Sequence, residues 1–289
     1  GLSCATYLAR LGYAVTVYEK RELAGGLDTY GMAEYKMTRE HSLAEVKQVE
    51  QLGVGFKLNQ LVTNPVELLT EHDAVFIGIG LGKTKELSIP GEEKSGVIDA
   101  LSFIEQIKTR EWPSVSFGKT VAVIGAGNTA IDAVTQAKRL GAEKAILVYR
   151  RTEKDAPAYD YEIDLAKSDG IEFAWQHTPL EIVGNGVVTG LKCRKENGDE
   201  VLIDCDMVIK AIGQQKQSDF FQTVGLETDE KGRLLVDDSM QTSKPGVFVG
   251  GDCVNGGAEE VDAAQSCKRA AAGIHFALTG ERIKLTGMG

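Results

Sequence analysis

A glycine-rich motif in the middle of the chain has the residue types and spacing of a binding site for the pyrophosphate of a dinucleotide. Gly125 allows a tight turn at the end of a buried strand, and Gly127 lets a phosphate approach the main chain without meeting a Cβ. The first N–H groups of the next helix would face this anion, and Ala130 is small enough for that helix to pack on the strand. The predicted contacts are Gly125, Gly127, Asn128, Thr129 and Ala130.

Arginines at the end of the same unit indicate which nucleotide it binds. Residues 121–151 read as a strand, the glycine turn, a helix and a second apolar strand at 145–149, with Arg150 and Arg151 at its tip. In such a unit, an acid at this position favours a free 2′-hydroxyl on the adenosine ribose, whereas an arginine favours a 2′-phosphate. This unit is therefore expected to bind NADP.

The N-terminal segment repeats this unit. When Gly1 is aligned with Ala130, the segment VTVYE that ends at Glu19 falls, after a two-residue difference, on ILVYR, which ends at Arg150. An acid stands in the first copy where the second has an arginine, so the first copy is expected to bind a ribose with free hydroxyls. Together the two copies predict FAD in the first unit and NADP in the second.

In this alignment Gly1 takes the place of the third glycine of a truncated motif. We expect the strand and the two glycines before it to be missing, and this chain to bind FAD less tightly than a longer form that carries them. A fragment of this kind has an alternative role as a non-catalytic nucleotide-binding scaffold. A purified protein without a flavin spectrum would favour that alternative.

The segments after Glu19 also have cofactor-binding character. Gly26, before Leu27, belongs to a glycine pair that permits close approach to a flat ligand, and residues 28–37 read as an irregular functional loop. Residues 74–80 read as a strand that runs into a glycine turn ending at Gly80, beside a cofactor.

The C-terminal part of the chain adds to the predicted FAD site. Residues 245–252 read as a strand that closes on Asp252, whose carboxylate can accept hydrogen bonds from a polyol chain. A helix at 258–278 would offer its first N–H groups and positive dipole end, near Glu260 and Val261, to a flavin.

The remaining patterns predict an α/β fold with two Rossmann-like dinucleotide-binding domains, the second inserted into the first, and a small antiparallel sheet. The discontinuous FAD-binding domain is expected at 1–86 and 214–289, and the NAD(P)-binding domain at 87–213. A helix is predicted at 38–52, and strands at 54–58 and 206–213. The antiparallel strands are predicted at 172–175, 181–183, 187–192 and 201–203.

Composition excludes several classes of function. At 289 residues the chain is long enough for two domains, and its net charge of −10 argues against nucleic acid or an anionic membrane as a partner. No apolar run reaches the roughly 20 residues that span a bilayer. Five cysteines without C-x-x-C spacing argue against a redox disulfide and against a local iron–sulfur or zinc site. A reduced, cytoplasmic protein fits best.

Taken together, the motifs resemble the two-dinucleotide-binding-domain flavoproteins, and within them the electron-input portion shared by the glutamate synthase small subunit and dihydropyrimidine dehydrogenase. The likeness covers nearly the whole chain, and segments 76–81 and 208–214 look closer to dihydropyrimidine dehydrogenases. It rests on Glu19, GGL at 25–27, VFIGIG at 75–80, VIGAGNTAIDA, VYRR, KAIG and FVGGD at 248–252.

This resemblance implies contacts for both cofactors and an electron route. FAD would contact Gly1, Glu19, Gly26, Leu27, Lys36, Val62 and Asp252. The nicotinamide nucleotide would contact Gly127, Asn128, Thr129, Arg150, Arg151, Ala211, Ile212 and Gly213. Lys36 would serve as the catalytic cation beside the flavin and as the exit for electrons, so that its replacement by alanine slows flavin reoxidation more than flavin reduction. Lys36 departs from the family pattern, because dihydropyrimidine dehydrogenases commonly have arginine there.

The implied function is that of a flavoprotein subunit that passes hydride from NAD(P)H to FAD and electrons to a partner. Members of this family carry a cysteine-rich segment that holds iron–sulfur clusters, so a catalytic or iron–sulfur partner is expected. The motifs favour a dihydropyrimidine dehydrogenase, with a glutamate synthase small subunit second and a ferredoxin–NADP reductase-like enzyme third.

Replacing Arg150 and Arg151 together with alanine tests the choice of nucleotide. A charge-assisted contact between arginine and a phosphate contributes about 1.5–3 kcal/mol. We therefore expect the KM for NADPH to rise about tenfold or more, while the KM for NADH changes little. Steady-state kinetics with both nucleotides provide the measurement, and parallel changes in the two constants would show that these arginines do not recognise the 2′-phosphate.

Overall fold

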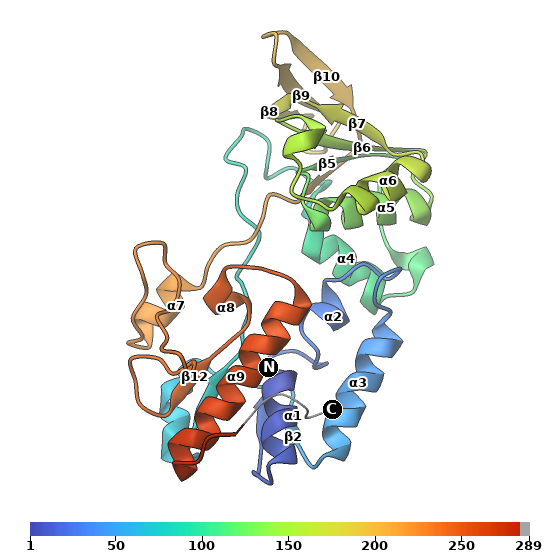
Figure 1. Ribbon diagram of the computed structural model, residues 1–289. Helices are drawn as coiled ribbons and strands as arrows, with labels where there is room; N and C mark the ends of the chain where they lie inside the picture. The colour runs from blue at the N-terminus through green and yellow to red at the C-terminus, as the bar shows by residue number, and fades with distance from the viewer. Residues whose placement is uncertain (284–289) are drawn as a thin grey trace. The chain divides into compact units, whose positions relative to one another are not determined.

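The computed structural model describes residues 1–283 and divides them into two compact units (Figure 1). The first unit comprises residues 1–25, 43–83 and the described residues from 215 onward, and the second comprises residues 26–42 and 84–214. The predicted α/β class and the insertion of the second unit into the first are confirmed. The segment 26–42 groups with the second unit, although the sequence analysis placed it in the FAD-binding domain.

A parallel sheet of five strands forms the centre of the second unit. In spatial order its strands are β4 (Val97–Asp99), β11 (Met207–Lys210), β5 (Thr120–Ile124), β6 (Lys144–Tyr149) and β7 (Glu172–Trp175). The helices that follow β4, β5 and β6 in the chain are α4 (Ala100–Thr109), α5 (Asn128–Leu140) and α6 (Asp160–Ser168). Short 3₁₀ helices are η2 (Trp112–Ser114) and η3 (Glu153–Asp155).

The two faces of this sheet are covered by different layers. Val121 and Val123 of β5 belong to the core that α4, α5 and α6 form with the sheet, whereas Ala122 and Ile124 belong to a second core on the other face. Because both faces are covered, these four residues are all buried, and the strand is apolar throughout instead of alternating with polar residues. The predicted strand–helix–strand unit is thus confirmed.

An antiparallel sheet covers the second face. Its strands, in the order β10, β9, β8, are β10 (Glu200–Asp204), β9 (Gly190–Lys195) and β8 (His177–Val183). The prediction that residues 172–175 join this sheet is wrong, because β7 pairs in parallel with β6. Only Gln176 separates β7 from β8, and its φ of 58° breaks the extended chain between the two sheets.

Two pairs of parallel strands occur in the first unit. β1 (Thr16–Tyr18) pairs with β2 (Gly55–Lys57), and β3 (Val75–Ile77) pairs with β12 (Val247–Val249). The helices are α1 (Leu2–Arg10), the 3₁₀ helix η1 (Pro65–Thr70), α7 (Ser218–Thr223), α8 (Asp252–Asn255) and α9 (Glu260–Thr279). None of the described helices, including α9, is long and apolar enough to cross a membrane.

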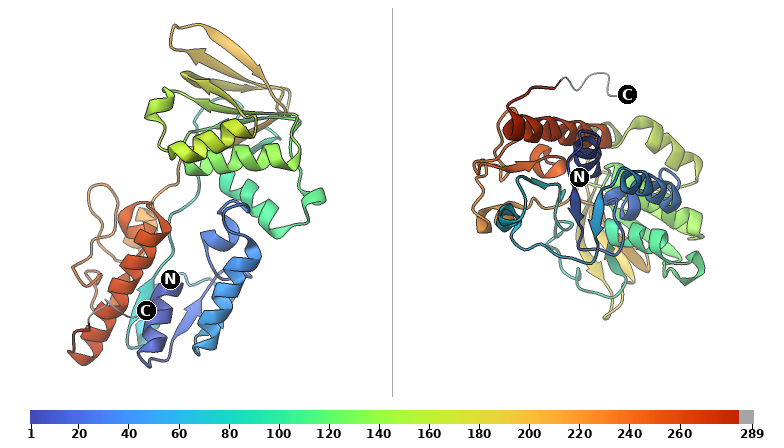
Figure 2. Two further views of the ribbon diagram at one scale, coloured as in Figure 1. Left: turned by 45° about the vertical axis from the view of Figure 1, so that its right-hand side comes forward. Right: turned by 90° about the horizontal axis from the view of Figure 1, so that it is seen from below.

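Close packing of α1 on α9 forms much of the core of the first unit, and the two helices lie side by side in Figures 1 and 2. Cys4 and Leu8 of α1 pack with Cys267 and Ala271 of α9 and with Phe248 of β12. Small side chains on both helices permit this close approach. Cys4 and Cys267 therefore serve as buried apolar residues on helices, as their sequence context predicts.

The segment 26–42 is more regular than the sequence indicates. Its first turn is the short helix α2 (Leu27–Tyr30), and α3 (Arg39–Gln51) begins at its end. The hydroxyl groups of Thr29 and Ser42 share a buried hydrogen bond of 2.7 Å, which joins the two ends of the segment. The irregular loop predicted at 28–37 is therefore limited to the residues that follow α2.

Candidate functional site

One edge of the parallel sheet gathers the residues predicted to bind the nicotinamide nucleotide. Gly125 follows β5, Arg150 follows β6 and Ala211 follows β11. The order of strands places β5 between β11 and β6, and all three run in parallel. Their carboxyl ends therefore meet at one edge, which is where α/β sheets commonly bind ligands.

The turn after β5 has room for no residue but glycine at its first position. Gly125 has a φ of 134°, and a Cβ there would stand 2.2 Å from the carbonyl oxygen of Ala211. Gly127 differs, because its φ is −84° and no atom lies within 4 Å of the place of a Cβ. Gly125 is therefore required by the packing of the strands, whereas Gly127 leaves open space in front of the main chain.

The N-terminus of α5 is suited to an anion. This helix has 13 residues and no side chain that caps its first N–H groups. Asn128 accepts a hydrogen bond from the N–H of Tyr159 at 3.3 Å instead of capping the helix, Thr129 is exposed, and Ala130 is fully buried against the sheet. Uncapped N–H groups, the helix dipole and the open space at Gly127 fit the pyrophosphate of a dinucleotide.

The flanks of this edge carry the other predicted contacts. Arg150 and Arg151 are both exposed beyond β6, where a 2′-phosphate can reach them. Ile212 packs against the core, and Gly213 has a φ of 90° with open space around it. The carbonyl of Gly213 accepts a hydrogen bond from the N–H of Lys85 at 2.9 Å, which holds the chain beyond β11 in place.

In the first unit, the paired strands β3 and β12 bring together two of the residues predicted to bind FAD. Gly80 lies three residues beyond β3, with a φ of 64° and open space in place of a Cβ. Asp252 begins α8, just beyond β12, and burial raises the pKa of its carboxyl group even though the N–H of Ala258 donates to it at 3.4 Å. A half-buried acceptor beside open main chain fits a polyol ligand.

The other predicted FAD contacts in the first unit occupy separate elements. Gly1 is the N-cap of α1, and Glu19 follows β1, where its carboxylate accepts a hydrogen bond from the N–H of Arg21 at 2.8 Å. Val62 lies in the loop before η1. Glu260 and Val261 begin α9, and Val261 is 73% exposed. Unlike α5, α9 has a capping box, because Glu259 and Asp262 satisfy its first N–H groups reciprocally.

Lys36, Gly26 and Leu27 belong to the second unit. The ammonium group of Lys36 lies 2.7 Å from Asp132 of α5 and 2.6 Å from Glu162 of α6. Burial by itself would lower the pKa of Lys36, but its interactions with the two carboxylates raise it. The predicted loop cation is thus paired with two nearly buried acids of its own unit.

These acids form a cluster that the sequence analysis missed. Tyr35 donates a hydrogen bond to Asp132 at 2.8 Å, and one carboxylate oxygen of Glu162 is buried without a hydrogen-bond partner. The sequence does hold a clue to Asp132. This acid follows the glycine motif on the buried face of an amphipathic helix, where a charge requires a partner. Glu162 offers no such local signal.

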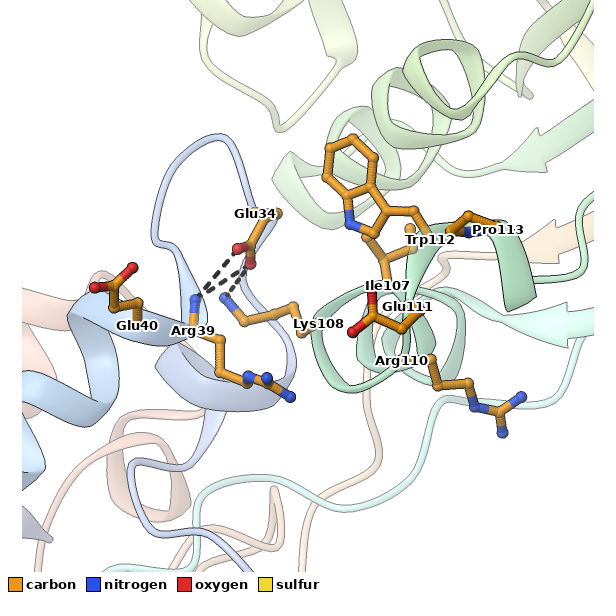
Figure 3. Close-up of a pocket in the computed structure, with 9 residues that line it drawn as sticks. All are labelled: Glu34, Arg39, Glu40, Ile107, Lys108, Arg110, Glu111, Trp112 and Pro113. Carbon is orange, nitrogen blue, oxygen red and sulfur yellow. Dashed lines mark hydrogen bonds and ion pairs between the residues drawn. The ribbon is translucent and has the colours of Figure 1, made fainter.

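A second missed residue is Lys108 of α4, whose side chain is fully buried. It donates a hydrogen bond to the carbonyl of Met37 and lies 3.5 Å from a carboxylate oxygen of Glu34. Figure 3 shows Lys108 and Glu34 among the residues, with Trp112, that line a cavity of about 450 Å³. Both acidic and basic side chains line this cavity, and none of the predicted site residues does. We therefore assign the cavity no part in nucleotide binding.

The cysteines offer no redox centre. All five are free and buried, and burial raises the pKa of Cys193 and of Cys205 to about 12. Thiols of this kind are poor nucleophiles at neutral pH. Among residues 1–283, no group of three histidine, cysteine or acidic side chains is placed to hold a metal ion.

The parallel sheet, the glycine turn and the second unit inserted in the first define a protein with two dinucleotide-binding domains. The family model for pyridine nucleotide-disulphide oxidoreductases matches residues 1–267, and the chain belongs to this family. It is therefore an oxidoreductase that uses FAD and NADP(H), as its two motifs predict.

Several curated proteins are similar to this chain. The glutamate synthase [NADPH] small chain of Escherichia coli K12 is 34% identical over 95% of this chain and 66% of its own length. The NADP(+)-dependent formate dehydrogenase subunit beta of Moorella thermoacetica is 33% identical over 95% of this chain and 42% of its own length. The chain thus spans less than two thirds of these two relatives.

Solved structures share the fold. The thioredoxin reductase of T. acidophilum matches with a TM-score of 0.77 at 22% identity, over 95% of this chain and 94% of that chain. Mycobacterium tuberculosis FprA in complex with NADPH matches with a TM-score of 0.75 at 18% identity, over 96% and 82%. The architecture of two Rossmann-like domains is confirmed.

Substitutions of the two motif glycines separate folding from binding. Gly125→Ala should lower the unfolding midpoint strongly, since the new Cβ meets the carbonyl of Ala211 and the residue has a positive φ. Gly127→Ala should leave the midpoint unchanged but weaken NADP⁺ binding at least tenfold, because the methyl group takes the space of a phosphate. Thermal unfolding and calorimetric titration measure both effects. A Gly127→Ala variant with wild-type affinity would contradict the assignment.

Lys36→Met tests the buried acidic cluster. Removing the cation leaves two nearly buried carboxylates without it, so we expect a loss of about 1–3 kcal/mol in the free energy of unfolding. A raised lysine pKa means that this contribution is complete below the pKa of the unfolded chain, about 10.4, and is lost as the pH rises through the folded pKa.

The difference between wild type and Lys36→Met should therefore be constant near neutral pH and shrink above about pH 10.4. Urea unfolding across this range measures it. Lys192→Met, which removes an exposed ion pair with Glu200, is the matched control and should change the midpoint little. Equal midpoints for wild type and Lys36→Met would show that the cluster does not stabilise the fold.

Proposed function

We propose that this chain passes hydride from NADPH to FAD and hands electrons on to a partner subunit. The observation that carries the proposal is the carboxyl edge of the parallel sheet, where an uncapped helix N-terminus and open main chain at Gly127 lie beside strand β6 and its two exposed arginines. Such an edge holds the pyrophosphate on backbone N–H groups and the 2′-phosphate on guanidinium groups.

The residues of the chain have binding and orienting roles in this function. The N-terminus of α5 and Gly127 would hold the nucleotide, and Arg150 and Arg151 would select its phosphorylated ribose. Gly80 and Asp252 would hold FAD in the first unit, with Glu19 at its ribose. The flavin, when bound, supplies the ability to accept two electrons as hydride and to release them singly. The protein aligns the two cofactors and requires no acid or base for this transfer.

A partner is expected because the described residues include no second redox centre that could accept electrons from the flavin. The five cysteines are all free and buried, none belongs to a C-x-x-C motif, and the described residues hold no group of three side chains placed for a metal ion. The similar proteins support this expectation, since they include a small chain of glutamate synthase and the beta subunits of a formate dehydrogenase and of an NADPH-Fe(3+) oxidoreductase.

The identity of the partner enzyme is a finer proposal. The motifs at 76–81 and 208–214 favour a dihydropyrimidine dehydrogenase, while the curated relatives favour a glutamate synthase. In both proposals the chain would take up electrons from a nicotinamide nucleotide. A free-standing ferredoxin–NADP reductase-like enzyme remains the third alternative, in which the acceptor is a separate small protein.

Anaerobic reduction of the FAD-loaded protein tests the proposal. NADPH should remove the absorbance of the oxidised flavin within the mixing dead time or the first seconds, and NADH should do so more slowly. An added one-electron acceptor such as ferricyanide should then restore the absorbance of the oxidised flavin. An aromatic disulfide should be reduced much more slowly, because the cysteines are buried. A FAD-loaded protein that NADPH does not reduce would contradict the proposal.

The scaffold alternative has a different outcome in the same experiment. A non-catalytic nucleotide-binding protein would bind NADP⁺ but would neither retain FAD nor transfer hydride. Flavin content after reconstitution and gel filtration distinguishes the two functions before any kinetic measurement.

A further inference from the structure

The exposed turn after β6 is closed by a capping box. Arg150 and Arg151 lead into the 3₁₀ helix η3, and residues 150–155 are all exposed. One carboxylate oxygen of Asp155 accepts hydrogen bonds from the hydroxyl of Thr152 at 2.6 Å and from the main-chain N–H of the same residue at 3.1 Å. The chain thus forms a compact, hydrogen-bonded turn directly after the two arginines.

Further hydrogen bonds tie this turn to the parallel sheet. The hydroxyl of Tyr149, the last residue of β6, donates to the carbonyl of Asp155 at 3.0 Å. The N–H of Gln176, just beyond β7, donates to the carbonyl of Arg151 at 2.9 Å. Because β6 and β7 are neighbours and run in parallel, the turn that carries the arginines is held on the carboxyl ends of two strands.

The two acids of this turn have partners other than the arginines. Hydrogen bonds from Thr152 lower the pKa of the Asp155 carboxyl group, which is therefore ionised at neutral pH. Glu153 lies 2.6 Å from Lys167 of α6, in an ion pair that is exposed on both sides and contributes little. The shape of the turn therefore depends mainly on Thr152 and Asp155.

We propose that Thr152 and Asp155 are positioning residues that fix Arg150 and Arg151 for the 2′-phosphate of the bound nucleotide. This inference rests on the proposed function and deepens it, because it assigns part of the selectivity for NADP(H) to residues that act through the arginines. A turn that is already ordered loses less conformational freedom when the guanidinium groups bind a phosphate. The pyrophosphate at the head of α5 should gain nothing from this order.

Calorimetric titration of the purified chain with NADP⁺ and with NAD⁺ tests the inference, because the two ligands differ only in the 2′-phosphate. Thr152→Val removes the hydroxyl and keeps the shape and charge of the side chain. It should reduce the preference for NADP⁺ over NAD⁺ about threefold to tenfold, the loss expected for one hydrogen bond. The affinity for NAD⁺ should not change, which also shows that the variant is folded. Thr152→Ser keeps the hydroxyl and should bind both nucleotides like wild type.

Asp155→Ala separates positioning from charge. Removing a negative charge near Arg151 would by itself strengthen the binding of a phosphate, whereas loss of the capping box should weaken it. We expect a weaker preference for NADP⁺, as in Thr152→Val.

Asp237→Ala is the matched control in the first unit. Asp237 also accepts hydrogen bonds from a hydroxyl and from a main-chain N–H, both of Ser239. Its replacement gives the same change in net charge and should leave the preference for NADP⁺ unchanged.

An unchanged preference in Thr152→Val, or a stronger preference for NADP⁺ in Asp155→Ala, would overturn the positioning role. Equal losses for NADP⁺ and NAD⁺ in Thr152→Val would also overturn it, because they would show a general effect on the fold or the site. Failure of the proposed function is recognised separately. A wild-type chain with equal affinity for the two nucleotides would contradict the selection of the 2′-phosphate itself, and the positioning role with it.

Discussion

The N–H of Ala211 donates to the carbonyl of Ile124, and the N–H of Gly125 donates to the carbonyl of Val148, so that three parallel strands end at the same level. The rest of the nucleotide site depends on this pairing. It brings the carbonyl of Ala211 so close to Gly125 that a Cβ on residue 125 is excluded. The chain then continues from Gly125 directly into α5, which begins at Asn128. The geometry of the site thus follows from the register of the strands, with a glycine where the segments after β5 and β11 come closest.

Electrostatics then determines where an anion can bind on a chain whose net charge is −10. Acidic surface repels phosphates in general, so attraction has to be local. The head of α5 supplies it through uncapped N–H groups, whereas α9 has its own acidic capping box and is already satisfied. Lys36 adds no free positive charge, because Asp132 and Glu162 pair with it. In the proposed function, the exposed Arg150 and Arg151 would therefore provide most of the specificity for a phosphorylated ribose.

Features that depend on neighbouring residues could be predicted from the sequence, whereas features that depend on contacts between distant residues could not. The unit from β5 to β6 was predictable almost to the residue, since an apolar strand, a glycine turn and an amphipathic helix are encoded locally. The sheet membership of β7 was not, because it depends on the left-handed conformation of Gln176 between two strands. The contact of Lys36 with Glu162 joins residues 126 positions apart, and no local pattern specifies such a pair.

In the proposed function, the second unit binds a nucleotide through its phosphates, and the arginines beyond β6 select the 2′-phosphate. The ratio of the dissociation constants for NAD⁺ and NADP⁺, measured on the unaltered chain from low to high salt, tests it most directly. We expect a marked preference for NADP⁺ at low salt that decreases as salt screens the exposed guanidinium groups. A ratio near one at every salt concentration would contradict it.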